Sequence, residues 1–295
     1  MFEDVRESIL KTLIYGDIFD YPLTKKEIWK FLIATKAKRT LFENAVSEFP
    51  PGRWELKQGL LFLLGRAEIV EIRRKRQQVS RKKLELAKKI IQKLSLVSTV
   101  LFIGISGGLA LENSKEDDDI DLFIITSRGT IWFTRLVLVL TLILMGQYRG
   151  QGKKKSQKIC LNMFLDENAL TLPKERQNLY TAHEVAQVMP IFQRNDTYIK
   201  FLDANKWVKK FLPNAMGRIR NQESEIKNQN KNPFIISHFS FLIFEWIAKR
   251  IQLFYMKNHI TSETISDTLL AFHPFEYKNY VLKEYNKRLR HYEIR

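Results

Sequence analysis

The chain has 295 residues, 45% of them hydrophobic, which is enough for a sizeable core and predicts two or three domains. A single cysteine, Cys160, excludes an intrachain disulfide and favours a reducing, cytoplasmic compartment. The formal net charge of +17 favours a polyanionic partner such as RNA, DNA, a nucleotide or an anionic membrane surface, although a Lys-rich composition also arises without any nucleic-acid role. The polar, charged first residues do not have the pattern of a secretory signal.

Residues 1–65 are predicted to form three helices closed by a β-hairpin. Thr24 and Glu27 have the spacing of a capping box at the start of the second helix. The third helix is expected over 39–49, and the hairpin follows over 54–64 around a glycine-containing turn. This order of elements resembles a winged helix–turn–helix unit.

In a winged helix–turn–helix unit, the third helix enters the major groove of DNA. Here that helix carries Glu43 and Glu48, which would repel phosphate, although Lys36, Lys38 and Arg39 precede it. We therefore expect a packing or partner-docking role for the winged-helix-like unit rather than DNA reading.

Residues 66–95 are predicted to form a basic connecting helix. Cations cluster at 73–76 and at 81–83, and leucines and isoleucines supply an apolar stripe along the other side. A basic face of this kind is either simply solvated or binds the backbone of RNA or DNA.

Residues 96–170 have the pattern strand, helix, strand, helix, strand. The strands are expected over 98–103, 120–126 and 158–165, a short helix begins at Leu109, and a longer helix covers 130–146. This alternation predicts an α+β fold built on one sheet.

An apolar run at 136–145 lies inside the longer helix. Its ten residues are well short of the roughly 20 that span a bilayer. We expect the helix to be buried on most sides, with no stable membrane insertion. A basic loop with Arg149 and the lysines at 153–155 follows it.

Residues 171–295 are predicted to form a helical domain, interrupted by a polar, mobile loop at about 214–232. An aromatic-rich helix over 233–256 favours a core or domain-interface role over a platform for stacking bases. His183 and Glu184 lie on an earlier helix that carries no second histidine at helical spacing, which favours a structural role over metal binding.

Asp119 and Asp121 are the strongest candidates for a metal site. One residue separates them on a strand, so both side chains point to the same face, with Cα atoms about 6.6 Å apart. Two carboxylates about 4 Å apart repel by roughly 4 kcal/mol at an effective dielectric near 20, and a bound cation reverses this. Mg²⁺ fits because it takes one or two carboxylates and completes its shell with phosphate oxygens and water. Asp117 and Asp118 are expected to be loop residues.

Gly107 and Gly108 form a turn between the first strand and the short helix. Glycine permits a positive φ and a close approach of the backbone to a ligand, and a helix start offers unpaired N–H groups to an anion. A phosphate cradle beside two metal-binding carboxylates suits phosphoryl or nucleotidyl transfer.

The Gly107–Gly108 turn, the apolar strand before it and the Asp119–Ile120–Asp121 strand after it resemble the signature of the DNA polymerase β-like nucleotidyltransferase superfamily over about residues 96–166. The resemblance implies a minimal nucleotidyltransferase mixed sheet, flanked here by the winged-helix-like unit and the helical domain. It also implies that Asp119 and Asp121 bind Mg²⁺ (or Mn²⁺) and that Gly107 and Gly108 bind the triphosphate.

In that superfamily, a third acidic residue on a later strand completes the site and helps to deprotonate the attacking hydroxyl. The matching strand here offers Asn162, which has no acidic group and cannot act as a base, and Asp166, which has the same parity but lies at the strand end. The sequence thus predicts a Mg²⁺-dependent nucleotidyltransferase acting on an acceptor hydroxyl of RNA, a small molecule or a protein. The alternative is a weak or inactive nucleotide-binding regulator that signals through its winged-helix-like unit.

Overall fold

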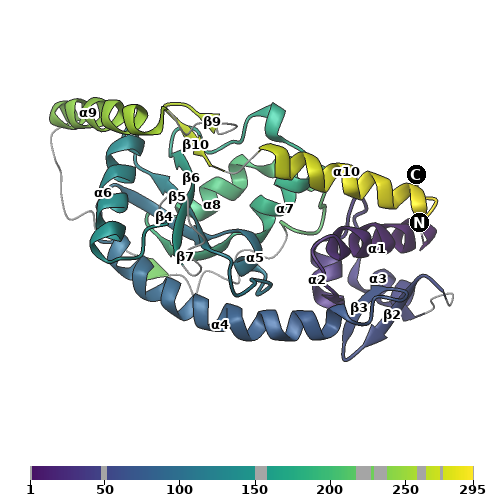
Figure 1. Ribbon diagram of the computed structural model, residues 1–295. Coiled ribbons are helices and arrows are strands. Elements are labelled where there is room, and N and C mark those ends of the chain that lie inside the picture. Colours follow the sequence, from purple (N-terminus) through teal and green to yellow (C-terminus); the bar gives the residue numbers. More distant parts are fainter. Residues whose placement is uncertain are drawn as a thin grey trace.

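The computed structural model describes residues 2–47, 52–149, 158–216, 227–228, 238–257, 264–272 and 275–294. The fold is α+β. A small N-terminal unit lies beside a larger sheet-containing body, and two long helices, α4 (Ile69–Leu94) and α10 (Phe275–His291), bridge them on opposite sides (Figure 1).

The N-terminal unit contains the three helices and the hairpin that the sequence predicts. The capping box is confirmed: the backbone N–H of Glu27 donates to Thr24 Oγ1 (3.2 Å), and the Thr24 N–H donates to Glu27 Oε2 (2.8 Å). A short additional strand joins the hairpin in an antiparallel sheet of order β1-β3-β2. The elements are α1 (Phe2–Asp17), β1 (Leu23–Thr24), α2 (Lys25–Lys30), α3 (Arg39–Ser47), β2 (Trp54–Lys57) and β3 (Leu60–Leu63); residues 48 and 49 of the predicted third helix lie outside the described residues.

The N-terminal unit is packed into the rest of the molecule. One apolar cluster runs without a break from α1, through Phe31, to Val185 of α7 (Leu179–Gln187) and Phe123 of the sheet. Asp17 of α1 forms ion pairs with Arg66 (2.8 Å) and with Arg288 of α10. These contacts agree with the packing role expected for the unit, while its assignment as a winged helix stays a prediction.

Helix α4 confirms the predicted connecting helix, but two of its cations are not on the surface. Arg73 is buried and pairs with Glu27 at 2.8 Å, and Lys83 is buried against the loop that precedes Asp119. Burial is possible because both cations find oxygen partners, which offset the cost of desolvation. The surface of α4 is therefore less basic than the sequence predicts.

The central sheet is mixed and carries the strands predicted for the core. β4 (Val100–Ile105) and β5 (Ile120–Thr126) run antiparallel, and β5 and β6 (Ile159–Asp166) run parallel across the helix α6 (Ile131–Leu144). Helices cover both faces, so these strands have almost continuous apolar sequences instead of alternating ones.

The prediction that residues 171–295 are entirely helical is wrong. Four strands from this segment extend the sheet to the order β8-β7-β4-β5-β6-β10-β9, so the sheet crosses the predicted boundary at residue 170. These strands have two to five residues, too few to show a period of two in the sequence. Pairing fixes them: β7 pairs with β4 and β10 with β6, while β8 pairs with β7 and β9 with β10. They are β7 (Met189–Gln193), β8 (Lys227–Asn228), β9 (Thr264–Ile265) and β10 (Leu269–Ala271).

The remaining elements after residue 170 are helical, as predicted. They include α8 (Thr197–Ala204), two 3₁₀ turns, η1 (Lys174–Arg176) and η2 (Lys206–Lys210), and α9 (His238–Met256). Most of the predicted mobile loop, 217–226 and 229–232, lies outside the described residues, and so do residues 153–155 of the basic loop.

Helices α6 and α9 pack against each other at the end of the molecule farthest from the N-terminal unit (Figure 1). Two expectations are corrected here. The end of α6 is not buried on most sides, because Leu144 is 89% exposed. Of the core or interface role expected for α9, the core part is wrong for the described aromatic side chains, because Phe254 is 85% exposed. Among the described residues, no helix combines the length and apolarity needed to cross a bilayer.

Candidate functional site

The glycine turn and the second predicted carboxylate lie in contact. After β4, the short helix α5 (Gly107–Ala110) begins with Gly107 at φ +66°. A Cβ added to Gly107 would lie 3.0 Å from Asp121 Oδ2, and the backbone N–H of Ser106 donates to the Asp121 carbonyl at 3.0 Å. Only glycine combines this backbone conformation with this spacing without strain. The structure thus brings Gly107 and Asp121 together as the predicted site requires.

Gly108 contacts its own loop. A Cβ there would lie 3.4 Å from the Asn113 carbonyl oxygen, and the Asn113 N–H donates to the Gly108 carbonyl at 2.8 Å. The loop that continues to Asp119 is held by Lys83, whose Nζ donates to Ser114 Oγ (3.1 Å) and to the Asp118 carbonyl (2.6 Å). Burial lowers the pKa of Lys83, and the nearby carboxylates oppose that shift.

Asp119 lies immediately before β5 and is mostly enclosed. Arg149 Nε lies 2.7 Å from Asp119 Oδ2, while Oδ1 is buried and accepts no hydrogen bond from the described residues. Desolvation raises the pKa of Asp119, and the positive charges of Arg149 and Lys83 oppose the rise. A buried carboxylate oxygen without a donor is costly, and a cation would satisfy it.

These two carboxylates fit Mg²⁺ better than a metal that needs several protein ligands. In the described part of the chain, no three His, Cys, Asp or Glu side chains gather in a way that could hold an ion. Mg²⁺ needs only one or two carboxylates when a triphosphate and water complete its shell. The unsatisfied Asp119 oxygen is the observation that favours an ion here.

The third position beside the carboxylates belongs to Cys160. The parallel register pairs Asp121 with Cys160, and a bulge between Leu122 and Phe123 leaves Asn162 as an extra residue on β6. Burial, with the charge of Asp121, raises the pKa of the Cys160 thiol to about 12, so the thiol is protonated at neutral pH. Arg149 Nη1 lies 3.6 Å from the Cys160 sulfur.

Asp166, the other predicted third residue, is not part of this group. It pairs with Thr126, five positions beyond Asp121, which is about 16 Å along the strand. Its carboxylate accepts backbone N–H groups from Gly129 (2.6 Å) and Asn168 (2.9 Å), so it closes the loops at that end of the sheet.

A cavity of about 370 Å³ opens beside the carboxylates. Gly107 and Asp121 line one side of it, and Tyr15, Tyr180 and Glu184 line the other. The cavity therefore lies between the sheet and the helices α1 and α7, at the junction of the N-terminal unit with the body, which is a common place for a ligand site.

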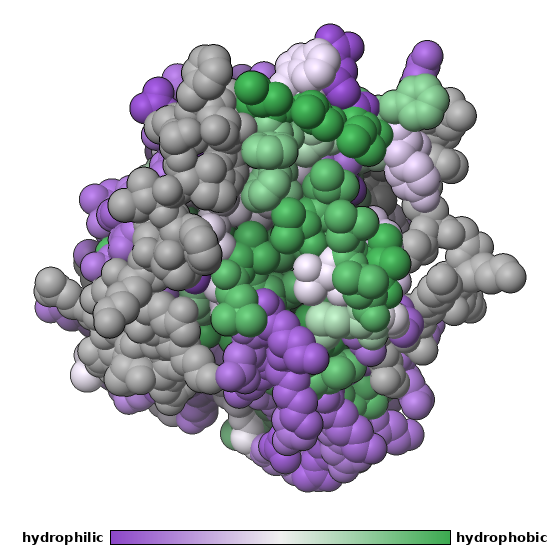
Figure 2. All heavy atoms as spheres, turned by 90° about the vertical axis from the view of Figure 1, so that its left-hand side faces the viewer, coloured by the Kyte–Doolittle hydropathy of each residue, from purple (hydrophilic) through white to green (hydrophobic). Residues whose placement is uncertain are grey.

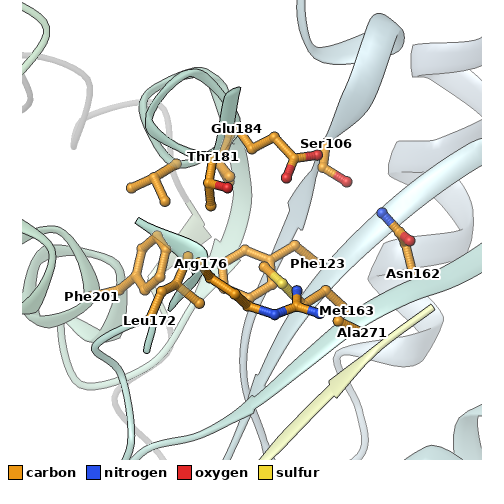
Figure 3. Close-up of a pocket in the computed structure, with 12 residues that line it drawn as sticks. Ser106, Phe123, Asn162, Met163, Leu172, Arg176, Thr181, Glu184, Phe201 and Ala271 are labelled. Carbon is orange, nitrogen blue, oxygen red and sulfur yellow. The ribbon is translucent and has the colours of Figure 1, made fainter. Parts of the chain in front are cut away.

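Glu184 is a candidate that the sequence pattern missed. It also lines a smaller cavity of about 40 Å³ together with Ser106 and Asn162, and its carboxylate points toward Ser106 (Figure 3). The sequence predicts a structural role for Glu184 because its helix carries no second histidine at the spacing of a metal site. The local sequence of α7 carries no signal for this position, because the packing of α7 against the sheet decides it.

His183, next to Glu184, has the buried position of a structural residue. Its ring stacks on Tyr15 with centroids 4.0 Å apart, and Nδ1 lies 3.0 Å from Gln187 Nε2. Burial lowers the pKa of His183 to about 3, so the ring is neutral at physiological pH.

Comparisons with protein-family models, with curated proteins and with solved structures give no match for this chain.

Proposed function

We propose that this chain is a Mg²⁺-dependent nucleotidyltransferase that moves a nucleoside monophosphate from an NTP to an acceptor hydroxyl. The observation that carries the proposal is the contact between the Gly107 turn and Asp121. Asp119, two residues earlier in the chain, pairs with Arg149. A backbone that approaches a ligand closely, next to two carboxylates, is suited to an NTP with its divalent ion.

Asp119 and Asp121 are the residues that would hold Mg²⁺, with Mn²⁺ as the other ion of suitable chemistry. The ion would supply neutralisation of the charge on the triphosphate. Arg149 lies within reach of the same charge, because its guanidinium is about half exposed while it pairs with Asp119. A planar guanidinium is well matched to phosphate oxygens.

The proposed transfer step changes two bonds at the α-phosphorus of the NTP. The acceptor oxygen forms a bond to the α-phosphorus, the bond from that phosphorus to the bridging oxygen breaks, and pyrophosphate leaves. The proton of the acceptor hydroxyl needs a base. Cys160 and Asn162 cannot serve, so we assign this role to Glu184, the carboxylate on the facing side of the cavity.

A second function is favoured by the missing third carboxylate on β6. A thiol stands beside Asp121, and Arg149 already neutralises Asp119. A protein of this kind would bind an NTP without turnover. Because the N-terminal unit borders the cavity, it would report the bound state to a partner protein or to a nucleic acid bound through basic surface.

One experiment separates the two functions. The purified full chain is incubated with each labelled NTP, Mg²⁺ or Mn²⁺, and total RNA, a metabolite extract or the protein alone, and incorporation of label is measured beside nucleotide binding. Transfer that is lost in Asp119→Ala and retained in Asp117→Asn supports the enzyme, because Asp117 is exposed in the same loop. Saturable NTP binding with no transfer supports the regulator, and no binding at all contradicts both.

A further inference from the structure

Large apolar side chains are exposed together at the end of the molecule opposite the N-terminal unit. Of the fifteen such side chains in the described residues, ten lie on α6 and α9, which we call the α6/α9 face. Helix α6 contributes Leu140, Ile143 and Leu144, and α9 contributes three isoleucines with Phe244, Trp246, Phe254 and Tyr255. In Figure 2, which looks at this end of the molecule, a broad hydrophobic area occupies the centre of the surface. A patch of this kind marks a site of interaction.

Two polar side chains of α9, Glu245 and Gln252, point inward to α6. The Glu245 carboxylate accepts the backbone N–H groups of Trp132 (2.8 Å) and Phe133 (2.7 Å) at the start of α6. About two turns further along the same face of α9, Gln252 donates to the Trp132 carbonyl at 2.7 Å and accepts a hydrogen bond from Arg135. These bonds fix the rotation of α9 about its axis, so its aromatic side chains face outward as a consequence of the fold.

The charges around the α6/α9 face are mostly positive, with Asp267, which pairs with Lys249, as an exposed carboxylate beside α9. Helix α6 has no acidic residue, and Glu245, the only acidic residue of α9, points inward to α6. Arg250 of α9 is exposed, and its guanidinium lies 5.3 Å from the centroid of the Trp246 ring. Lys257, directly after α9, is also exposed. Hydrophilic surface lies directly below the face in Figure 2, where α4 runs, and the last turns of α4 expose Lys88, Lys89 and Lys93.

We propose that the α6/α9 face docks on an anionic lipid membrane, with α9 lying in the plane of the interface. Helices that bind this way present Trp, Phe and Leu to the acyl chains and cations to the headgroups. The negative potential of an anionic leaflet attracts nearby Lys and Arg. Neither helix is able to cross the bilayer, so the contact is peripheral. A second copy of the chain is the alternative occupant, and the test below distinguishes it from the membrane.

The test uses the full chain and two kinds of vesicle, phosphatidylcholine alone and phosphatidylcholine mixed with phosphatidylglycerol. We expect sedimentation with the anionic vesicles, weakened by salt, and a loss of more than about tenfold in binding for the double variant Trp246→Ser and Phe254→Ser. The matched control is Leu56→Ser with Leu64→Ser, which removes two exposed apolar side chains from the N-terminal hairpin and should leave binding unchanged.

A second measurement keeps the proposal testable if the double variant does not fold. Brominated lipid should quench part of the tryptophan fluorescence of the wild type, and the conservative change Trp246→Phe should remove that part. The proposal is overturned if anionic vesicles do not bind the protein, if the double variant binds as well as the wild type, or if the face instead produces a dimer in sedimentation velocity that Trp246→Ser dissolves. None of these readouts depends on nucleotide transfer, so the proposed function is tested separately.

Discussion

The site cavity and the α6/α9 face are opposite exceptions to the rule that charged groups are exposed and apolar groups are buried. The cavity encloses charged groups, and the α6/α9 face exposes apolar ones. At the cavity, the carboxylate of Asp121 lies on a sheet whose strands are almost wholly buried, and Asp119 precedes the same strand. On α9, the carboxylate of Glu245 points inward and Trp246 points to solvent. Enclosed charge and exposed apolar surface both cost free energy in the isolated protein. In the two proposals, each region is completed by a partner: a cation with a phosphate at the cavity, and an apolar surface at the α6/α9 face.

The largest expected effect is on the enclosed charge. Asp121→Asn should lower nucleotide transfer by about 10³-fold, which corresponds to about 4 kcal/mol, because the amide keeps the shape but loses the charge that the ion needs. The measurement is the initial rate with the preferred NTP at saturating Mg²⁺. Asp117→Asn, in the exposed loop, is the control and should keep the wild-type rate. Equal transfer rates in the two variants would contradict a metal-binding role for Asp121.

The second effect sharpens the contrast within a single helix. Leu138 of α6 is fully buried and Leu144 is 89% exposed. Leu138→Ala should lower the free energy of unfolding by about 3 kcal/mol, and Leu144→Ala should change it by less than about 0.5 kcal/mol. Urea unfolding in the absence of lipid measures both. A large loss in Leu144→Ala would mean that the end of α6 is covered in the isolated protein, which would break the comparison.

The third effect concerns the glycine turn. Gly107→Ala should weaken NTP binding by about tenfold, because alanine at φ +66° is strained by about 1–2 kcal/mol and its Cβ presses on Asp121. Gly129→Ala has a similar φ of +63° but open space around the Cβ. The Gly129→Ala variant should therefore be less stable to unfolding but bind the NTP as tightly as the wild type. Calorimetric titration measures the NTP affinity of both variants. Equal affinities in the two variants would separate the turn from the nucleotide site.

A smaller effect is expected from His183, at the back of the cavity. Its pKa of about 3 in the folded protein lies below the ordinary value of 6.5, so in this window the unfolded chain binds more protons. Stability should therefore fall as pH falls, by about 1 kcal/mol between pH 6.5 and 5.5 from this group. Unfolding of the wild type and His183→Phe at both pH values isolates the contribution, and identical pH dependence would place the ring in water.

The smallest effect is expected at Arg149. In Arg149→Gln, Asp119 loses a competing cation, so Mg²⁺ should bind up to about fivefold more tightly in the absence of nucleotide, while NTP binding becomes weaker. Magnesium titration followed by intrinsic fluorescence measures the first change. Lys206→Gln removes an exposed cation from a surface pair and is the control. Weaker Mg²⁺ binding in Arg149→Gln would show that the guanidinium orders the site instead of competing for it.

Part of the fold was predictable because its signals are local. Local residue patterns predict three elements: the capping box of Thr24 and Glu27, the apolar strand over 120–126 and the long helix α4. The strands β7 and β10 were not predictable, because so short a strand is defined by its neighbours in the sheet. The register that pairs Asp121 with Cys160, and the bulge that leaves Asn162 as an extra residue on β6, also depend on the neighbouring strand.

The sequence by itself determined the glycine turn and the strand that carries Asp121, because both follow from local residue patterns. The common face of Asp119 and Asp121 stays a prediction, since Asp119 lies just before β5. The sequence also determined that α6 and α9 are apolar. Only the tertiary structure decided which side of α9 faces solvent, since Glu245 and Gln252 find their hydrogen bonds on α6, more than a hundred residues earlier in the chain. Only the tertiary structure placed Glu184 across the cavity from Asp121, because that position depends on how α7 packs against the sheet.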